Sequence, residues 1–346
     1  MFDRPTSDRP AQARLSRWRR APAPRAAASA TKAVRSIAAF AFCAWLGGLA
    51  LGGLGGEAQA AKVFRWVDGK GVPHYGDHVP ETVDPEQTPI SRIPVPAAPE
   101  PIARLTLEPM ADRIQAWAEN TLYGPIEVRL YQPGHRARDN PLRADPPLPA
   151  QAVVPALQRV VVTTLGNDRT SLLRMDVVPG SPNARPRDVE YLYPLQLPEV
   201  RIEQGYGGRH SHFDAQNRHA VDFGAQIGTP VLAARAGTVM QVEGDFDRGG
   251  LNAEKYAGRA NFVRILHDDG SMALYAHLQL DGVLVRVGQR VRKAQMIGLS
   301  GNTGYTSGPH LHFVVQVNRG MRLESIPFRM FGPGGILRFT EPQATP

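Results

Sequence analysis

The sequence has almost no cysteine. Its 346 residues include one, Cys43, which lies within the first sixty. The rest of the chain therefore has neither a disulfide framework nor a zinc site built from thiolates. Aromatic residues are also few, at 7%, but 42% of the residues are hydrophobic. That proportion excludes a wholly disordered chain and is enough for buried cores in about two or three domains.

The sequence also lacks an excess of basic residues outside its N-terminal segment. The net charge is +8, which over a whole surface would favour a nucleic-acid partner. However, the first sixty residues hold nine Lys/Arg and three Asp/Glu, which leaves 31 basic and 29 acidic residues for the remainder. Because the excess is local, we expect no nucleic-acid partner.

Residues 1–60 have the pattern of a secretory signal peptide. Basic residues from Arg17 to Arg35 precede an uncharged, apolar run of 21 residues, Ser36 to Gly56, and Ala58-Gln59-Ala60 offers small residues for cleavage. Such a signal would direct export of the chain, and cleavage after Ala60 would leave the exported part without a membrane span. The alternative is an uncleaved anchor in the inner membrane, because 21 uncharged residues just suffice to cross a bilayer.

Two short segments follow the signal. Residues 61–82 contain aromatic and β-branched runs on either side of Asp68-Gly69-Lys70-Gly71, which predicts a small β-hairpin module. This module resembles a short domain of unknown function that follows signal peptides. Its His74 and His78 lie beside the turn without a third ligand, so we interpret them as surface residues. Residues 83–104 are rich in proline and predict an extended linker.

Residues 105–197 show the alternation of β-strands. Ile126, Val128 and Leu130 alternate with more polar residues, and the run from Leu173 to Val177 does the same. Proline-rich turns separate the runs, and no long helical period is visible. We predict a small β-sandwich. Nothing in it has catalytic spacing, so we interpret it as a positioning or autoinhibitory domain, or as a spacer.

Histidine is concentrated in the C-terminal part of the chain, where seven of the ten lie between His210 and His312. In a strand that begins at His310, alternation places His310 and His312 on one face. Leu311 and Phe313 then belong to an apolar stripe on the other face. A histidine pair opposite the apolar stripe favours a functional site over a core position.

Two neighbouring segments add candidate residues. The stretch 261–278 is typical of a hairpin in which alternation puts Tyr275 and His277 on one face. His267 adjoins its turn, and we expect it to be solvated. Asp222 lies in an apolar strand, where an unpaired carboxylate would be costly, so it should have a cation or strong donors as partners.

Together these elements resemble the lysostaphin/LytM-type zinc metallopeptidases, which cut peptide cross-links of bacterial peptidoglycan. The resemblance implies a mainly β chain whose antiparallel metallopeptidase domain spans 198–330, with a C-terminal tail at 331–346. With the signal segment, it implies an exported protein in the periplasm. The motifs that carry it are Gly205-Tyr206-Gly207, Asp222, Gly228-Thr229-Pro230-Val231, Gly237-Thr238-Val239, Tyr275-Ala276-His277-Leu278, Gly301-Asn302-Thr303-Gly304 and His310-Leu311-His312-Phe313.

The resemblance also implies roles for these residues. Asp222 and His312 correspond to ligands of one Zn²⁺, and His277 and His310 to the active-site imidazoles. Imidazole and carboxylate suit zinc, and three protein ligands leave one position open for water. The implied substrate is a stem peptide of peptidoglycan.

The substrate groove is expected close to His310. Between Gly301 and Ser307 lie three residues that we expect to line it. They are Asn302, Tyr305 and Thr306. An ordinary glycine-rich turn is the alternative interpretation.

The sequence departs from the family pattern at the first zinc ligand. The family has a histidine four residues before the aspartate, where this chain has Arg218, which cannot bind zinc. The preceding loop contains Ser211-His212, which resembles one branch of the family, and we predict His212 as the ligand. His219 is three residues from Asp222, so in a regular strand it faces the other way unless a bulge intervenes. The remaining alternatives are His210 and Asp214.

Two other interpretations are open. The Gly228–Val231 and Gly237–Val239 motifs also resemble hairpins of lipoyl and biotinyl carrier domains, but no lysine lies at a suitable exposed tip. Alternatively, the loss of the usual first ligand would suit an inactive module that binds and activates another cell-wall hydrolase, with a regulatory protein as partner. Retention of Asp222, His277 and the pair at 310 and 312 argues against that alternative.

Overall fold

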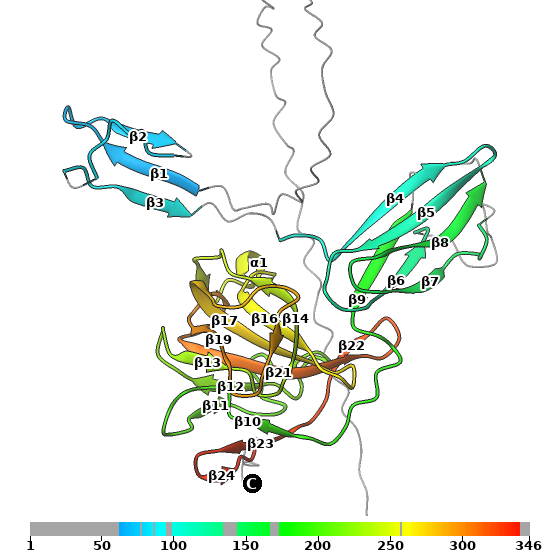
Figure 1. The fold of residues 1–346 in the computed structure, drawn as a ribbon. Helices are drawn as coiled ribbons and strands as arrows, with labels where there is room; N and C mark the ends of the chain where they lie inside the picture. The colour runs from blue at the N-terminus through cyan, green and yellow to red at the C-terminus, as the bar shows by residue number, and fades with distance from the viewer. Residues whose placement is uncertain are drawn as a thin grey trace, which may run out of the picture. The chain divides into compact units, whose positions relative to one another are not determined.

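The computed structural model describes residues 62–76, 78–85, 87–94, 99–133, 144–166, 173–256 and 258–339. The predicted signal peptide lies outside these residues. The described part is built of β-strands with one short helix, α1 (Ala253–Tyr256), so the mainly β fold class is confirmed (Figure 1). Within it, no helix has both the length and the apolar character that a membrane span needs.

The N-terminal module is a three-stranded antiparallel sheet in the order β2-β1-β3. The carboxylate of Asp68 closes the turn between β1 and β2 by accepting hydrogen bonds from the backbone amides of Lys70 and Val72. The predicted hairpin is therefore present. Its strands are β1 (Lys62–Val67), β2 (Pro73–Gly76) and β3 (Ser91–Pro94).

The third strand corrects the expected boundary of the linker at 83–104. Ser91–Pro94 pairs with Lys62–Arg65 instead of forming an extended spacer. Proline is compatible with an edge strand, because one side of such a strand needs no ladder donors. His74 is exposed, as expected, and its ring stacks on Trp66 with 5.6 Å between the ring centroids.

A β-sandwich follows, made of two three-stranded antiparallel sheets, β4-β5-β8 and β7-β6-β9. Ile126, Val128 and Leu130 are fully buried, as their alternation predicts, and Ala116 and Val162 of the other sheet share their core. The predicted sandwich is confirmed. Its strands are β4 (Ala103–Pro109), β5 (Arg113–Asn120), β6 (Ile126–Tyr131), β7 (Ala150–Val154), β8 (Arg159–Gly166) and β9 (Arg174–Pro179).

The C-terminal domain is organised around one large sheet, with strand order β11-β12-β21-β17-β16-β14-β18 and with β13, β19 and β22 attached. Leu311, Phe313 and Val315 of β21 pack in its core with Phe223 and Tyr275. The strands are β11 (Ile202–Gln204), β12 (Val221–Gly224), β13 (Pro230–Leu232), β14 (Gly237–Glu243), β16 (Asn261–Leu266), β17 (Met272–Val283), β18 (Arg290–Val291), β19 (Met296–Ser300), β21 (His310–Asn318) and β22 (Leu323–Ser325). Two further strands, β15 (Gly249–Gly250) and β20 (Gly304–Tyr305), pair in parallel.

The core of this domain extends past the expected limits of 198 and 330 at both ends. The strand β10 (Glu190–Leu192) pairs in parallel with β23 (Arg329–Gly332), which also pairs with β24 (Gly335–Ile336). Tyr191 and Phe339 are buried in the same core as Phe313. Residues expected in the sandwich and in the tail therefore belong to the C-terminal domain, because their rings bury apolar surface there.

A buried carboxylate connects the sandwich to the C-terminal domain. Glu127 of β6 accepts hydrogen bonds from the side-chain amide of Asn318, at 2.9 Å, and from the backbone amide of Met321, at 2.7 Å. Met240 and Met272 of the C-terminal domain belong to the sandwich core. Asn318 lies eight residues after His310 on β21, or roughly 26 Å along the strand. These contacts favour a positioning role for the sandwich.

Replacing Glu127 with alanine is expected to lower the free energy of unfolding by about 2 kcal/mol, because the buried side-chain amide of Asn318 and the partly buried amide of Met321 lose this acceptor. Urea unfolding of the chain from residue 61 onward measures this. Gln151→Ala, at an exposed position of the neighbouring strand β7, is the control and should change stability by less than about 0.5 kcal/mol. Equal midpoints for the two variants would contradict the proposed role of Glu127.

His267 corrects another expectation, because it is buried instead of solvated, with 3% of its surface exposed. Its Nδ1–H donates to the carbonyl of Ala236 at 2.9 Å. The hairpin turn beside it is covered by a distant segment, since the amides of Arg185 and Arg187 bond to Asp269. Burial lowers the pKa of His267 to about 4.

The low pKa of His267 predicts a loss of stability in acid. The unfolded chain binds the proton near the ordinary pKa of about 6.5, so the stability due to neutral His267 disappears as the pH falls from there to about 4. Between pH 7 and pH 4 the wild type should lose about 3 kcal/mol more than His267→Gln, whose amide can still donate to Ala236. Urea unfolding at both pH values measures the difference, and parallel pH profiles would disprove the prediction.

Candidate metal centre

Three buried side chains form a cluster with the composition of a zinc site. His212, Asp222 and His312 place one ligand atom each within 4.8 Å of one another. Oδ1 of Asp222 lies 3.2 Å from Nε2 of His212 and 2.8 Å from Nδ1 of His312. Within the described residues, this is the one group of three or more such side chains that is close enough to hold a metal ion.

Two adjacent strands position the aspartate and one histidine. Asp222 on β12 pairs directly with His312 on β21, and the neighbouring pair is Val221 with Phe313. Directly opposed residues of an antiparallel pair project to the same face of the sheet. Because Phe223 and Phe313 point into the core, the two ligand candidates lie on the opposite face.

His212 reaches the cluster from the loop between β11 and β12. Its backbone amide donates to the carbonyl of Gly208 at 3.0 Å, and its Nδ1–H donates to the carbonyl of Gly205 at 2.8 Å. A carbonyl can only accept, so Nδ1 carries a proton. Nε2 faces Oδ1 of Asp222 and is the nitrogen whose lone pair could bind a metal once its proton is released.

The other three candidates for the first ligand bind elsewhere. His219 directs Nδ1 to the carbonyl of Ser325 at 3.0 Å, and its ring packs edge-on against Tyr206. His210 is exposed. Asp214 accepts hydrogen bonds from the backbone amides of Gln216 and Asn217 in its own loop. The structure thus brings His212 to Asp222 and leaves His219, His210 and Asp214 outside the cluster.

The two remaining histidines lie next to this cluster. The ring centroids of His277 and His310 are 4.6 Å apart, and Nε2 of His310 is 3.7 Å from Oδ1 of Asp222. Both imidazoles donate from Nδ1 to a backbone carbonyl, His277 to Thr303 at 2.6 Å and His310 to Gly308 at 2.8 Å. Nε2 of each ring is consequently the nitrogen that can exchange a proton with a substrate.

His277 reaches this position through a β-bulge, which corrects the expectation that it shares a face with Tyr275. Ala276 pairs with Phe262 and Leu278 with Asn261, so His277 is the extra residue of β17. Its φ is 64°, a left-handed conformation that L-residues rarely adopt. Tyr275 points into the core, whereas the bulge turns His277 toward His310. Such strain costs about 1–3 kcal/mol and is typical of functional sites.

The electrostatics of the cluster keep the aspartate charged. Burial alone would raise the pKa of Asp222, but hydrogen bonds from His212 and His312 hold it well below its usual range. Burial would lower the pKa of His212, and the bond to Asp222 raises it instead. Desolvation, with the nearby imidazoles of His310 and His312, lowers the pKa of His277 to about 3. An anionic carboxylate with two imidazoles is a donor set that fits Zn²⁺.

Residues 216–323 match the sequence profile of Peptidase family M23. This stretch contains Asp222, His277, His310 and His312 in the geometry just described. The chain carries a peptidase M23 domain. The resemblance to the lysostaphin/LytM-type enzymes is thereby confirmed. Residues 53–104 match a second profile, Domain of unknown function DUF4124, which confirms the resemblance of the N-terminal module.

The relatives of the M23 domain include named peptidases. The chain is 39% identical over 113 residues to the peptidoglycan DD-endopeptidase ShyA of Vibrio cholerae, covering 30% of this chain and 23% of that protein. It is 35% identical over 114 residues to the glycyl-glycine endopeptidase ALE-1 of Staphylococcus capitis, covering 33% and 28%. A solved structure of the catalytic domain of lysostaphin from Staphylococcus simulans is 31% identical in sequence. The match covers 34% of this chain and 81% of that one, with a TM-score of 0.27. The chain spans about a quarter of the length of the curated relatives it matches.

The sequence analysis missed Gln204, a buried residue of the C-terminal domain. Its Nε2 donates to Oδ2 of Asp222 at 3.1 Å and to Oγ of Ser211 at 2.7 Å, and its Oε1 accepts the amide of His210 at 3.0 Å. Gln204 thus orients the carboxylate and connects the His212 loop to β11. Its position immediately before the Gly205-Tyr206-Gly207 motif was the one signal for it in the sequence.

The residues expected to line the groove lie on the loop that leads to His310. The hydroxyl of Thr306 is 2.9 Å from Oδ1 of Asn302 and 3.4 Å from Nδ1 of His310, and Thr306 is buried. Tyr305 has 38% of its surface exposed. Thr306 therefore supports the loop and the imidazole, while Tyr305 is accessible to a substrate.

Proposed function

We propose that this chain is a zinc-dependent endopeptidase that hydrolyses peptide cross-links of peptidoglycan in the cell envelope. The observation that carries the proposal is the convergence of His212, Asp222 and His312 with the imidazoles of His277 and His310. The M23 match supports the reaction type, and the endopeptidase names of ShyA and ALE-1 support peptidoglycan as the substrate class.

The zinc ion would be held by Nε2 of His212, the carboxylate of Asp222 and Nδ1 of His312. Bound there, zinc supplies a Lewis acid and lowers the pKa of a coordinated water to about 7. The buried position of these three side chains excludes competing solvent, and Gln204 keeps the carboxylate oriented.

His277 and His310 perform the proton transfers in this proposal. Each ring is held by its Nδ1–H bond to a backbone carbonyl, which directs its chemistry to Nε2. One imidazole is neutral and accepts a proton from the attacking water at Nε2. The other is protonated on both nitrogens and donates from Nε2–H to the oxyanion of the tetrahedral carbon. When the C–N bond breaks, the proton taken from water is passed to the leaving amine. The products are one free carboxylate and one free amine.

The test is digestion of purified sacculi by the chain from residue 61 onward, with added zinc and with a chelator, followed by mass analysis of the released fragments. We expect loss of cross-linked dimers that the chelator abolishes and that zinc restores. A folded protein that contains zinc and releases nothing would contradict the proposal. The alternative of an inactive activator module predicts neither bound zinc nor release, but stimulation of a second hydrolase.

We propose the periplasm as the location, from the signal pattern of residues 1–60. Fusion of this segment to a reporter enzyme that is active only outside the cytoplasm should give activity. Sequencing the N-terminus of the exported protein distinguishes cleavage after Ala60 from a retained inner-membrane anchor. A reporter that stays inactive would contradict export.

A further inference from the structure

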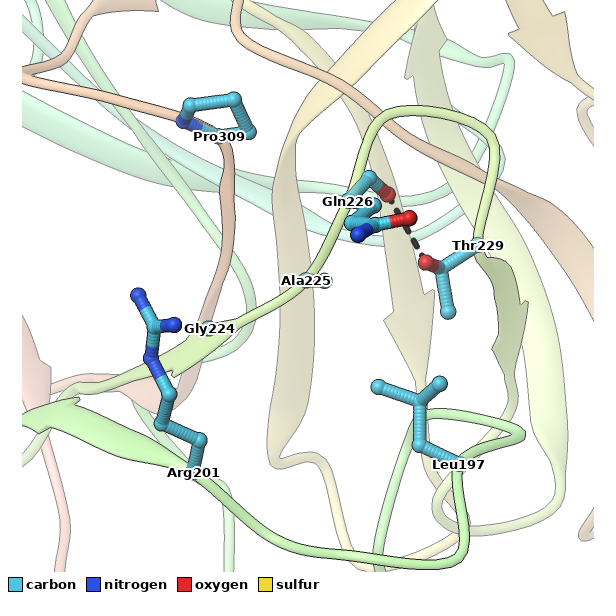
Figure 2. Close-up of a pocket in the computed structure, with 7 residues that line it drawn as sticks. All are labelled: Leu197, Arg201, Gly224, Ala225, Gln226, Thr229 and Pro309. Carbon is cyan, nitrogen blue, oxygen red and sulfur yellow. Dashed lines mark hydrogen bonds between the residues drawn. The ribbon is translucent and has the colours of Figure 1, made fainter.

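A pocket of about 530 Å³ lies beside the candidate metal centre (Figure 2). Its lining includes Arg201, Gly224, Gln226 and Pro309. Gly224 pairs with His310 across β12 and β21, and Pro309 directly precedes His310. The pocket is therefore adjacent to one of the two imidazoles that the proposed reaction uses.

Arg201 lies over Gly224, on the same face of the sheet as Asp222. The amide of Gly224 donates to the carbonyl of Arg201 at 2.9 Å. A Cβ atom at position 224 would lie 2.7 Å from Nε of Arg201, so glycine leaves the space that this side chain fills. Figure 2 shows the guanidinium beside Gly224, with Pro309 across the pocket. Because Gly224 and Asp222 are two residues apart, the guanidinium lies roughly 7 Å along the strand from the metal ligand.

The pocket offers an anion hydrogen-bond donors, although the Glu203 carboxylate also lies beside Gly224, where a Cβ atom would be 2.8 Å from its Oε1. Arg201 is the one charged residue among those that line it. The guanidinium forms an ion pair with Glu203, but 78% of the Arg201 side chain nevertheless remains exposed. An arginine presents five N–H donors, so donors remain for a second carboxylate in a bidentate arrangement.

We propose that Arg201 is a specificity-determining residue that binds a free carboxylate of the substrate on the residue that supplies the amine of the scissile bond. This inference rests on the proposed function. The acyl residue has used its carboxyl group in the scissile bond itself, so the free carboxylate next to that bond belongs to the amine side. Two residue lengths of an extended peptide span about 7 Å, which matches the separation of Arg201 from Asp222 along the strand.

The test uses two synthetic cross-linked stem-peptide dimers. They are identical except that the residue supplying the amine of the scissile bond carries a free carboxylate in one and a carboxamide in the other. The zinc-loaded wild type should prefer the carboxylate by about 10- to 100-fold in kcat/KM, the usual effect of a hydrogen bond to a charged group. Arg201→Ala should bring this preference close to one, mainly through KM, and Arg201→Lys should keep part of it.

A variant of Glu203 distinguishes substrate binding by Arg201 from a purely structural ion pair. If Arg201 binds the substrate, Glu203→Gln removes a competing carboxylate and lowers KM for the carboxylate dimer, opposite to Arg201→Ala. If the pair only stabilises the strand, both substitutions act in the same direction on both dimers. The matched control is Arg322→Ala. Arg322 forms an ion pair with Glu324 at the same sequence spacing and with similar exposure, and Glu324 lies on β22, which pairs with the far end of β21.

Failure of the inference and failure of the proposed function give different results. Arg201→Ala with the wild-type preference for the carboxylate overturns the inference while cleavage continues. If the wild type cleaves neither dimer, the proposed function fails, and calorimetric binding of the two dimers still tests Arg201. A carboxylate preference in binding that Arg201→Ala abolishes supports the inference, and equal binding of the two dimers overturns it.

Discussion

Zinc binding and peptide hydrolysis are both expected to disappear in His312→Ala, whereas His310→Ala should keep its zinc and lose turnover. His312 places Nδ1 2.8 Å from the carboxylate of Asp222 inside the three-ligand cluster. His310 lies beside the cluster, with Nε2 3.7 Å from that carboxylate. Loss of one proton-transfer group costs about 10²- to 10⁴-fold in rate. Loss of the metal removes the nucleophile and the Lewis acid together, so we expect at least about a thousandfold loss for His312→Ala.

Two measurements on each variant check this prediction. Metal analysis after dialysis should give one zinc per chain for the wild type and His310→Ala, and none for His312→Ala. Turnover of a cross-linked peptide should be low in both variants. His74→Ala changes an exposed histidine of the N-terminal module and should leave both measurements unchanged. Equal, undiminished activity in the two site variants would refute the mechanism.

The second large effect is expected at His212. His212→Ala should lose zinc and with it at least about a thousandfold of the activity, because the cluster then keeps two protein ligands where a catalytic zinc site needs three. His219→Ala should keep its zinc, since its ring bonds to Ser325 instead. Loss of that hydrogen bond should lower the free energy of unfolding of His219→Ala by about 1 kcal/mol.

Metal content, activity and urea unfolding of these two variants form one experiment. The comparison is matched, because the two histidines are seven positions apart in the same region between β11 and β12. The reverse pattern, with zinc lost only in His219→Ala, would show that the loop rearranges when the metal binds. It would also invalidate the assignment of His212.

Short-range periodicity in the sequence was sufficient to predict several features of this protein. The alternation of two residues in a strand predicted the sandwich strand Ile126–Tyr131 and the apolar face of His310–Asn318, both of which the structure confirms. The same alternation separated His310 and His312 from the core. The motif order from Gly205 to Phe313 identified the M23 domain, since its turns need glycine at fixed positions.

Other features depend on long-range contacts and irregular backbone, which alternation does not encode. A one-residue bulge reversed the direction of His277, and the fold of an irregular loop chose His212 among the candidate ligands. A segment some eighty residues away in the sequence buried His267. Gln204 gained its role only because β11 lies next to β12. In each case the side chain's environment comes from residues distant in the sequence or from an irregular backbone, and local hydrophobic patterns carry no information about either.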